Sequence, residues 1–510
     1  MSQIVSDLKR VAGSSGLYAV ANMAQRGLSF ILLPVYTRFL DPSEYGILEL
    51  LTGLSAILFG LLLLGMPSAL TKVFHRDCEG EEEQKAVLPT ALALDLGALL
   101  LGGGLLFAFA ERVGIWIVGE AGRADVIRLA VATVVVSSLV AIVLSSFRAR
   151  EQALSYAVLN FVQFGFGMLL NVALVVWFRM GIHGVLWGNL ISAVVALPLG
   201  MWMARSDLVP RFERRLVRPL LHFGVLVIPT AITGWVITMA DRYLLRYFGE
   251  ASGPLQEALG EVAVYSVGYK IGMVLQMGLV WPFQLAWPAV AFSISKRPEY
   301  RSTYARVLTY LVFALTLGVL GLSLVSREGL EAFAGPSYRR AHEVVPWVAL
   351  AYAFAGVQFC LAPGVHVAKM TKVLPLFSLV GAALNIGLNV LWIPAHGMLG
   401  ATWATTASYA FLALATALLA QRYHPVDLEV GRLVKVVAAG ALVFAVGAGV
   451  DLGFGLVAGL TWQLFLVLCG FPALVLSTGF LEPGERRRIG ELASRLASWN
   501  GGGHEPRNDE

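Results

Sequence analysis

The sequence predicts an all-α integral membrane protein with about 14 transmembrane helices, built as two pseudo-symmetric six-helix lobes and two C-terminal helices. Three observations support this fold class. Of the 510 residues, 57% are apolar and only 14% are charged, and the mean hydropathy of +0.72 exceeds what a water-facing core can hide. Apolar runs of about 20 residues recur along the chain. Finally, the two halves of the chain share a sequence repeat.

The apolar runs define the elements in chain order. The first lobe, 1–204, contains six predicted spans, at about 14–37, 45–69, 87–109, 125–146, 154–177 and 184–203. A basic linker at 205–220 precedes the second lobe, 221–420, with spans at about 221–245, 264–291, 305–325, 344–365, 373–393 and 400–420. Helices 13 and 14 occupy 433–480, and a tail at 481–510 holds a short amphipathic helix. Each predicted span, unlike the amphipathic helix of the tail, is long enough to cross a bilayer.

Two pairs of segments carry the repeat. GIHGVLWGNLIS begins at Gly181 and GMLGATWATTAS at Gly397, and both share the spacing GxxGxxWxxxxS. Earlier in each half, Arg38 matches Arg246 with an offset that is smaller by eight residues, as an insertion in the acidic loop after Gly249 would produce. Six helices separate the copies, so both have the same orientation, and the repeat is of the parallel type. Two such lobes enclose a central cavity.

Charge predicts the topology. Most of the 38 lysines and arginines fall on one side of the predicted spans, which by the positive-inside rule is the cytoplasm. Both termini are then cytoplasmic, in a multi-pass protein of the cytoplasmic (inner) membrane. The basic residues are scattered through short loops and form no continuous stripe, so no nucleic-acid partner is predicted. The three cysteines lie far apart and predict neither a disulfide nor a zinc site.

Ionisable residues within the spans are candidates for function, because each costs roughly 2.5–3.5 kcal/mol to insert. The candidate headgroup-binding residues are Arg26, Arg242 and Lys270, and the supporting or coupling candidates are Asn22, Gln25, Glu49 and Asp241. All the charged members lie on the first helix pair of either lobe. The surplus of cations favours an anionic ligand, and arginine grips phosphate through two nitrogens. Alternatively, these residues form ion pairs that only fasten helix ends.

Two Trp-Pro dipeptides lie in the eighth predicted span. Pro282 and Pro288 each remove a backbone hydrogen bond, so we expect bends that serve as a hinge or gate for alternating access. The chain has no Walker A loop, no HExxH motif and no long soluble segment. We therefore expect no catalytic residues, no metal and no cofactor, with H⁺ or Na⁺ as possible coupling ions, and a carrier in preference to an enzyme.

The runs SFILLPVYTRFLDPSEYGILELL, MADRYLLRYFG, VAVYSVGYKIG and NVLWIPAHGMLGATWATTASY resemble the Wzx-like polysaccharide flippases, the polysaccharide transporter family of the multidrug/oligosaccharidyl-lipid/polysaccharide (MOP) superfamily. The resemblance covers about 14–420. It implies a V-shaped, MATE-like pair of lobes around a cationic cavity. This cavity would move an undecaprenyl-diphosphate-linked oligosaccharide, the repeat unit of an O-antigen, capsule or exopolysaccharide, from the inner to the outer leaflet.

The resemblance also implies roles and partners. Arg26, Arg242 and Lys270 would meet the diphosphate, and Asp241 would orient Arg242. The partners would be the lipid-linked oligosaccharide, membrane lipids and the polysaccharide polymerase machinery. Three alternatives stay open: a lipid II flippase of peptidoglycan synthesis, a cation-coupled multidrug exporter of the same superfamily, and a membrane-embedded glycan polymerase or ligase.

Overall fold

The computed structural model describes residues 30–209, 211–370, 372–449, 455–482 and 484–485. In these ranges every regular element is helical. The first half contains α2 (Leu33–Phe39), α3 (Pro42–Leu62), α4 (Met66–Arg76), α5 (Glu81–Ala98), η1 (Leu99–Gly103), α6 (Gly104–Ala108), α7 (Ala110–Ile117), α8 (Ala124–Ala149), α9 (Ala153–Asn160), η2 (Phe161–Phe166), α10 (Gly167–Val172), η3 (Ala173–Trp177) and α11 (Gly181–Met203).

The second half contains α12 (Arg214–Ser252), α13 (Leu255–Gly272), η4 (Gln276–Val280), α14 (Trp281–Ile294), α15 (Tyr300–Phe333), η5 (Pro336–Glu343), α16 (Val345–Val367), α17 (Val373–Tyr423), α18 (Val430–Gly449), α19 (Leu456–Phe465), η6 (Leu466–Gly470) and α20 (Phe471–Ser477). Of the elements named η, η5 is a 3₁₀-helix and the others are π-helices.

Twelve helical segments of the described chain are long and apolar enough to cross a membrane, and the protein is a multi-pass membrane protein. One of them, Val373–Tyr423, covers two of the predicted spans. Non-helical backbone at Gly397 divides this segment into two helices, one for each span. The first predicted span, 14–37, lies mostly outside the described residues, as does the predicted amphipathic helix of the tail. The total of fourteen helices therefore stays a prediction, whereas the all-helical membrane fold is confirmed.

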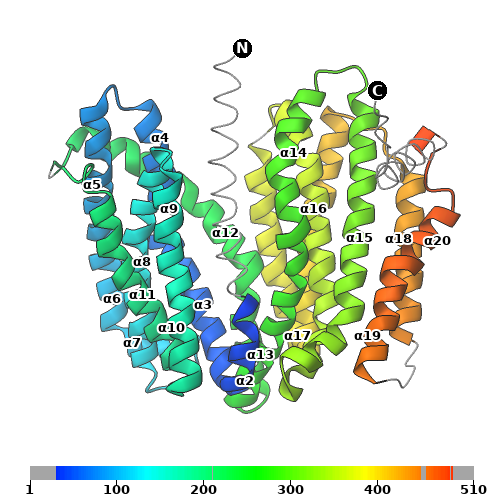
Figure 1. Cartoon of the computed structure of the whole chain (residues 1–510), viewed down its shortest axis with the longest axis horizontal. Helices are drawn as coiled ribbons and strands as arrows, with labels where there is room; N and C mark the ends of the chain where they lie inside the picture. The colour runs from blue at the N-terminus through cyan, green and yellow to red at the C-terminus, as the bar shows by residue number, and fades with distance from the viewer. Residues whose placement is uncertain (1–29, 210, 371, 450–454, 483, 486–510) are drawn as a thin grey trace, which may run out of the picture.

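The helices form two lobes that stand apart at one end and meet at the other, like a V (Figure 1). The first lobe contains α3–α11, and the second contains α13–α17 with α18–α20 on its outer side (Figure 1). The long helix α12 joins them, since it contacts α3, α4 and α5 in one lobe and α13 and α17 in the other. It begins at Arg214, so the second half of the predicted linker is helical.

The lobes meet where α3 packs against α13. The two backbones approach so closely that a Cβ added to Gly46 would lie 2.1 Å from the carbonyl oxygen of Leu259. Only glycine permits this contact. The close approach positions the polar side chains of α3 opposite those of α12 and α13.

The contacts between lobes follow the sequence repeat. Arg38 donates from Nη2 to the carbonyl oxygen of Ala332 in α15, at 3.0 Å. Its predicted counterpart Arg246 donates from Nη2 to the carbonyl oxygen of Trp116 in α7, at 2.6 Å. Each arginine thus reaches into the opposite lobe, and the two acceptors are repeat-related by sequence position. This exchange matches the pseudo-symmetric arrangement that the sequence repeat predicts.

The repeat glycines adopt a matching backbone conformation. Gly181 at the start of α11 has φ +57°, and Gly397 within α17 has φ +52°. A carboxylate lies beside each one, that of Glu44 near Gly181 and that of Glu261 near Gly397. Glu261 Oε1 also accepts the backbone N–H of Met398 at 2.9 Å. Residues other than glycine adopt this left-handed backbone conformation only at a cost in free energy. In each six-helix unit it occurs where the last helix begins.

The eighth predicted span is not one regular helix. It comprises α13, the π-helix η4 and α14, and Pro282 is the second residue of α14. Pro288 lies inside α14. The π-helical turns of η4 lie directly before Pro282. The proline ring removes a helical hydrogen bond in these turns. A hinge at these prolines stays a prediction.

Candidate functional site

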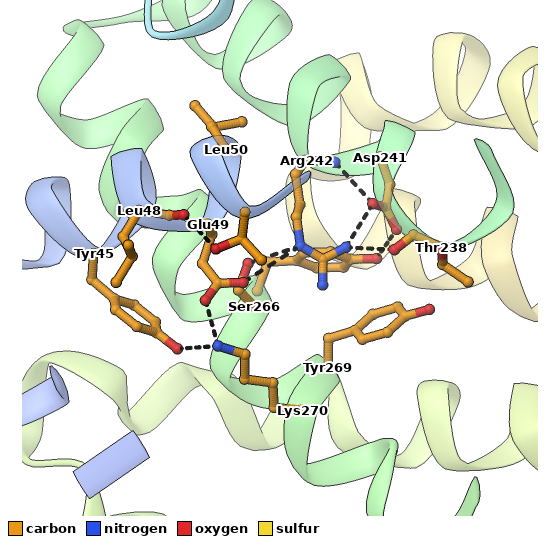
Figure 2. Close-up of polar contacts among 12 residues, drawn as sticks. Tyr45, Leu48, Glu49, Leu50, Thr238, Asp241, Arg242, Ser266, Tyr269 and Lys270 are labelled. Atoms are coloured by element: carbon orange, nitrogen blue, oxygen red, sulfur yellow. Dashed lines mark hydrogen bonds and ion pairs between the residues drawn. The ribbon is translucent and has the colours of Figure 1, made fainter. Parts of the chain in front are cut away.

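The structure brings four predicted site residues together between the lobes (Figure 2). Glu49 on α3 accepts a hydrogen bond from Lys270 Nζ on α13. The same Nζ donates to Tyr45 Oη at 2.9 Å. The second carboxylate oxygen of Glu49 lies 3.9 Å from Arg242 Nε on α12. One carboxylate of the first lobe therefore bridges two cations of the second.

Asp241 holds Arg242 from the side opposite Glu49. Its Oδ1 accepts the backbone N–H of Arg242 at 2.9 Å and Arg242 Nη1 at 3.1 Å. Tyr265 donates its hydroxyl to Asp241 Oδ2. The Asp241 carboxylate is fully buried and Arg242 is 2% exposed, and burial of this kind requires that both charges be paired. The hydrogen bonds from Arg242 to Asp241 fix the direction of the guanidinium.

The Arg242 guanidinium is fixed by further contacts. Nη1 donates to the carbonyl oxygen of Thr238 at 2.7 Å, and Nε donates to Ser266 Oγ at 3.2 Å. The guanidinium carbon lies 4.5 Å from the ring centre of Tyr269, a cation–π contact. Within the described chain the second terminal nitrogen, Nη2, forms no hydrogen bond, and no dashed line reaches it in Figure 2. The guanidinium is thus held in one orientation, with one terminal nitrogen left without a hydrogen bond to the described chain.

These charges border a cavity of about 490 Å³. Glu49, Arg242 and Lys270 all line it, whereas Asp241 lies behind Arg242. The rest of the wall comes mainly from α3, α8, η2, α10 and α11 of the first lobe. A larger cavity, of about 810 Å³, lies between α15, α16, α18 and α19. It contains none of the predicted site residues, so the smaller cavity is the candidate site.

The described residues test only part of the expected surplus of cations. The described part of the network holds two cations and two carboxylates, because Arg26 lies outside the described residues. Asn22 and Gln25 also lie outside them. The cavity wall itself carries two cations and one carboxylate among its described residues. Glu49 occupies both of these cations in the structure.

Pro282 and Pro288 do not border this cavity. Sequence reasoning overlooked the tyrosines that complete the network, Tyr45, Tyr265 and Tyr269. Tyr45 lies four residues before Glu49 on α3, and Tyr265 and Tyr269 are four residues apart on α13 just before Lys270, which was the available signal. It also overlooked the uncharged polar residues of the first lobe. In the described chain no three His, Cys, Asp or Glu side chains are grouped so as to hold a metal ion.

Several solved structures share this fold at low sequence identity. The lipid II flippase MurJ in an inward closed conformation aligns over 91% of this chain and 100% of its own, with a TM-score of 0.69 and 14% identity. An inward-facing multidrug resistance MATE family transporter of the MOP superfamily covers 79% of this chain and 97% of its own, with a TM-score of 0.62 and 14% identity. A MOP superfamily transporter from Pyrococcus furiosus, reported to have a binding pocket of reverse polarity, covers 80% of this chain and 95% of its own, at 0.56 and 12%.

No curated protein sequence matches the chain. The model of one protein family does match, over residues 11–293, more than half of the chain. The matched region includes α3, α12 and α13, which supply the whole charged network. The chain therefore belongs to the polysaccharide biosynthesis protein family, and its fold is that of the MOP superfamily transporters.

Proposed function

We propose that the protein is a flippase that moves an undecaprenyl-diphosphate-linked oligosaccharide from the inner to the outer leaflet of the cytoplasmic membrane by alternating access. The supporting observation is the cavity between the lobes, bordered by Arg242 with an unused nitrogen and by Lys270. A diphosphate is a dianionic ligand that both cations can grip at once. Arg26 is proposed as a third contact, with Asn22 and Gln25 beside it.

The chemistry of the substrate fits a cleft open at one end. A polyprenyl tail can remain in lipid while the charged headgroup passes through a polar cavity, so the barrier of carrying phosphate through hydrocarbon is avoided. The lobes stand apart at one end and are joined at the other by α3 and α13 (Figure 1). Alternating access then requires that the contacts of Glu49 with the second lobe open and re-form.

Glu49 links ligand binding to this motion. It is 3% exposed and joins α3 to both cations. When a diphosphate takes Lys270 and Arg242, Glu49 loses its partners, and a buried unpaired carboxylate is unfavourable. It must then take up a proton or move. We propose that this step couples the headgroup to separation of the lobes and to a H⁺ or Na⁺ gradient.

The test is a leaflet-translocation assay in vesicles with three substrates: an undecaprenyl-diphosphate oligosaccharide, lipid II and a cationic drug. Transport of the oligosaccharide lipid alone, lost in Arg26→Ala and Arg242→Ala variants that express normally, supports the proposal. Preferred transport of lipid II would make the protein a peptidoglycan-precursor flippase instead. Drug transport that survives Arg242→Ala would make it a multidrug exporter. Collapse of the H⁺ or Na⁺ gradient with an ionophore tests the coupling.

Orientation is tested by cysteine labelling from either face of the membrane. We propose that the turns after α4 and α11 face the cytoplasm and that the turns after α7 and α15 face outward, as the positive-inside rule predicts. Single cysteines introduced at Ser206 and Gly335 report on the two faces. Labelling of Ser206→Cys from outside intact cells would overturn this orientation.

A further inference from the structure

The candidate cavity has two chemically different walls. Among the described residues, all charged side chains that line the cavity lie on the wall formed by α12, α13 and Glu49. The described lining residues on α8, η2, α10 and α11 include no charged side chain but six uncharged polar ones. We call these six the neutral wall; they are Thr133, Ser137, Gln163, Asn171, Asn189 and Ser192. Hydrocarbon-embedded helices place polar side chains inward only where they meet polar partners.

Part of the hydrogen-bonding capacity of the neutral wall is already used. Thr133 Oγ1 donates to the carbonyl oxygen of Leu129 at 2.8 Å, and Ser192 Oγ donates to that of Asn189 at 2.9 Å. Asn171 Nδ2 donates to Asn189 Oδ1 at 3.0 Å. These bonds leave hydroxyl lone pairs as acceptors. Among the described residues, nothing accepts a hydrogen bond from Asn189 Nδ2, which stays a donor.

Gln163 supplies both a donor and an acceptor. It is only 8% exposed and borders the cavity, yet no hydrogen bond joins its side-chain amide to the described chain. Its donor and acceptor groups are therefore left for a ligand in the cavity. Gln163 lies in the π-helix η2, and such π-segments often occur at functional sites, since one added residue turns the following side chains to a new direction. An amide presented in this way points to a polar ligand.

The repeat-related positions of the two lobes have different surroundings. Asn189 and Ser192 correspond to Thr405 and Ser408 of the second lobe by the common spacing. Both counterparts are fully buried, and Thr405 Oγ1 lies 3.5 Å from Asp241 Oδ2. In the second lobe, Thr405 thus contacts the buried Asp241. The first lobe instead places Asn189, which is partly exposed, on the cavity.

Sugar hydroxyls both donate and accept hydrogen bonds, so they match amides and hydroxyls that do the same. We infer that the neutral wall, centred on Gln163 and Asn189, binds the sugar next to the diphosphate and selects the glycan. The inference rests on the proposed function, because it needs the diphosphate at Arg242 and Lys270. Phosphate contacts then bind every lipid diphosphate alike, whereas the neutral wall distinguishes one saccharide from another.

The experiment measures binding of four undecaprenyl diphosphate probes to the purified protein: the bare diphosphate and its hexose, N-acetylhexosamine and deoxyhexose derivatives. The test variant is Gln163→Leu. The control is Gln463→Leu, because Gln463 is also 8% exposed but lies on α19, outside this cavity, where its Nε2 donates to the carbonyl oxygen of Gly447 at 3.0 Å. A third variant, Lys270→Gln, removes a phosphate contact.

At least one saccharide probe should bind the wild type more tightly than the bare diphosphate. Gln163→Leu should weaken that probe by about ten- to a hundredfold, the effect of leaving a hydrogen bond unmade in a buried site. Gln163→Leu should leave binding of the bare diphosphate unchanged, and Gln463→Leu should leave binding of every probe unchanged. Lys270→Gln should weaken binding of all four probes. Equal binding of all probes by the wild type, or an equal loss for all in Gln163→Leu, would overturn the inference alone. Undecaprenol serves as a fifth probe without phosphate, and if the wild type bound it as tightly as undecaprenyl diphosphate, the proposed function would be overturned instead.

Discussion

The ionic link between Glu49 and Lys270 yields a quantitative prediction about how the lobes are held together. Glu49→Gln removes the carboxylate with little change of shape, Lys270→Met removes the ammonium group, and the double variant completes a thermodynamic cycle. Arg306 and Glu482 form a matched control pair at 3.3 Å, but their side chains are 45% and 50% exposed. The two cycles compare a buried ion pair with a solvated one.

The magnitude follows from the geometry. The second cation that Glu49 contacts gives the scale of the attraction. Arg242 Nε and Glu49 Oε2 are 3.9 Å apart, which corresponds to about 4 kcal/mol of attraction at an effective dielectric constant of about 20. Desolvation of the ions offsets much of this gain. Loss of Glu49 leaves two cations short of a partner, and removing one member of a buried pair costs about 3–5 kcal/mol. We expect the lower figure, because the Lys270 side chain is 22% exposed at the cavity.

Unfolding of the purified protein in mixed detergent micelles, monitored by tryptophan fluorescence, measures these free energies. We expect Glu49→Gln to lower the free energy of unfolding by about 3 kcal/mol and the cycle to give a coupling of about 1–3 kcal/mol. The Arg306–Glu482 cycle should give at most about 1 kcal/mol. Additive effects of Glu49→Gln and Lys270→Met, within about 0.5 kcal/mol, would refute the inter-lobe link.

Three further predictions concern other parts of the molecule. Gly397→Ala should lower the free energy of unfolding by about 1–3 kcal/mol, because φ is +52° and the added Cβ would lie 2.4 Å from Glu261 Oε1; Gly387→Ala, with nothing within 4 Å, should be neutral or stabilising, and equal effects in a thermal melt would contradict this reasoning. Burial lowers the pKa of His424 below its ordinary value of 6.5, so below that pH the unfolded chain binds a proton that the folded chain does not, and stability falls. The melting temperature should therefore drop between pH 7 and pH 5, and His424→Phe should drop less. Arg242→Lys should lose at least about tenfold in diphosphate binding despite keeping the charge, since lysine lacks the planar fork; wild-type affinity in a titration would exclude a specific guanidinium contact.

The fold follows from the sequence wherever a one-dimensional pattern is sufficient. Apolar runs mark the spans because each must cover the hydrocarbon thickness. The repeat located Gly181 and Gly397, which share a left-handed backbone. Boundaries were less accurate: α12 begins at Arg214 where the prediction placed the span at 221, because a basic stretch can continue a helix beyond the bilayer.

The charged members of the described site were predictable from the sequence, but their pairing and their uncharged neighbours were not. Charged residues on the first helix pairs were expected to share a cavity, and four of them lie together. That Glu49 bridges both cations depends on how α3 and α13 rotate and approach at Gly46, which spacing along one chain does not encode. Gln163 was missed for another reason. Its direction depends on the π-helix η2, and the apolar pattern of the fifth span reads as an ordinary α-helix.

The central claim is that Arg242 and Lys270 carry the phosphates of a lipid substrate across the membrane. The most direct measurement is the rate of transfer of an undecaprenyl-diphosphate oligosaccharide between leaflets of reconstituted vesicles, for the wild type, Arg242→Gln, Lys270→Gln and the exposed-cation control Arg306→Gln. We predict transfer by the wild type and the control, and a loss of at least about tenfold in both cavity variants. Transfer at the wild-type rate by Arg242→Gln and Lys270→Gln would contradict the account.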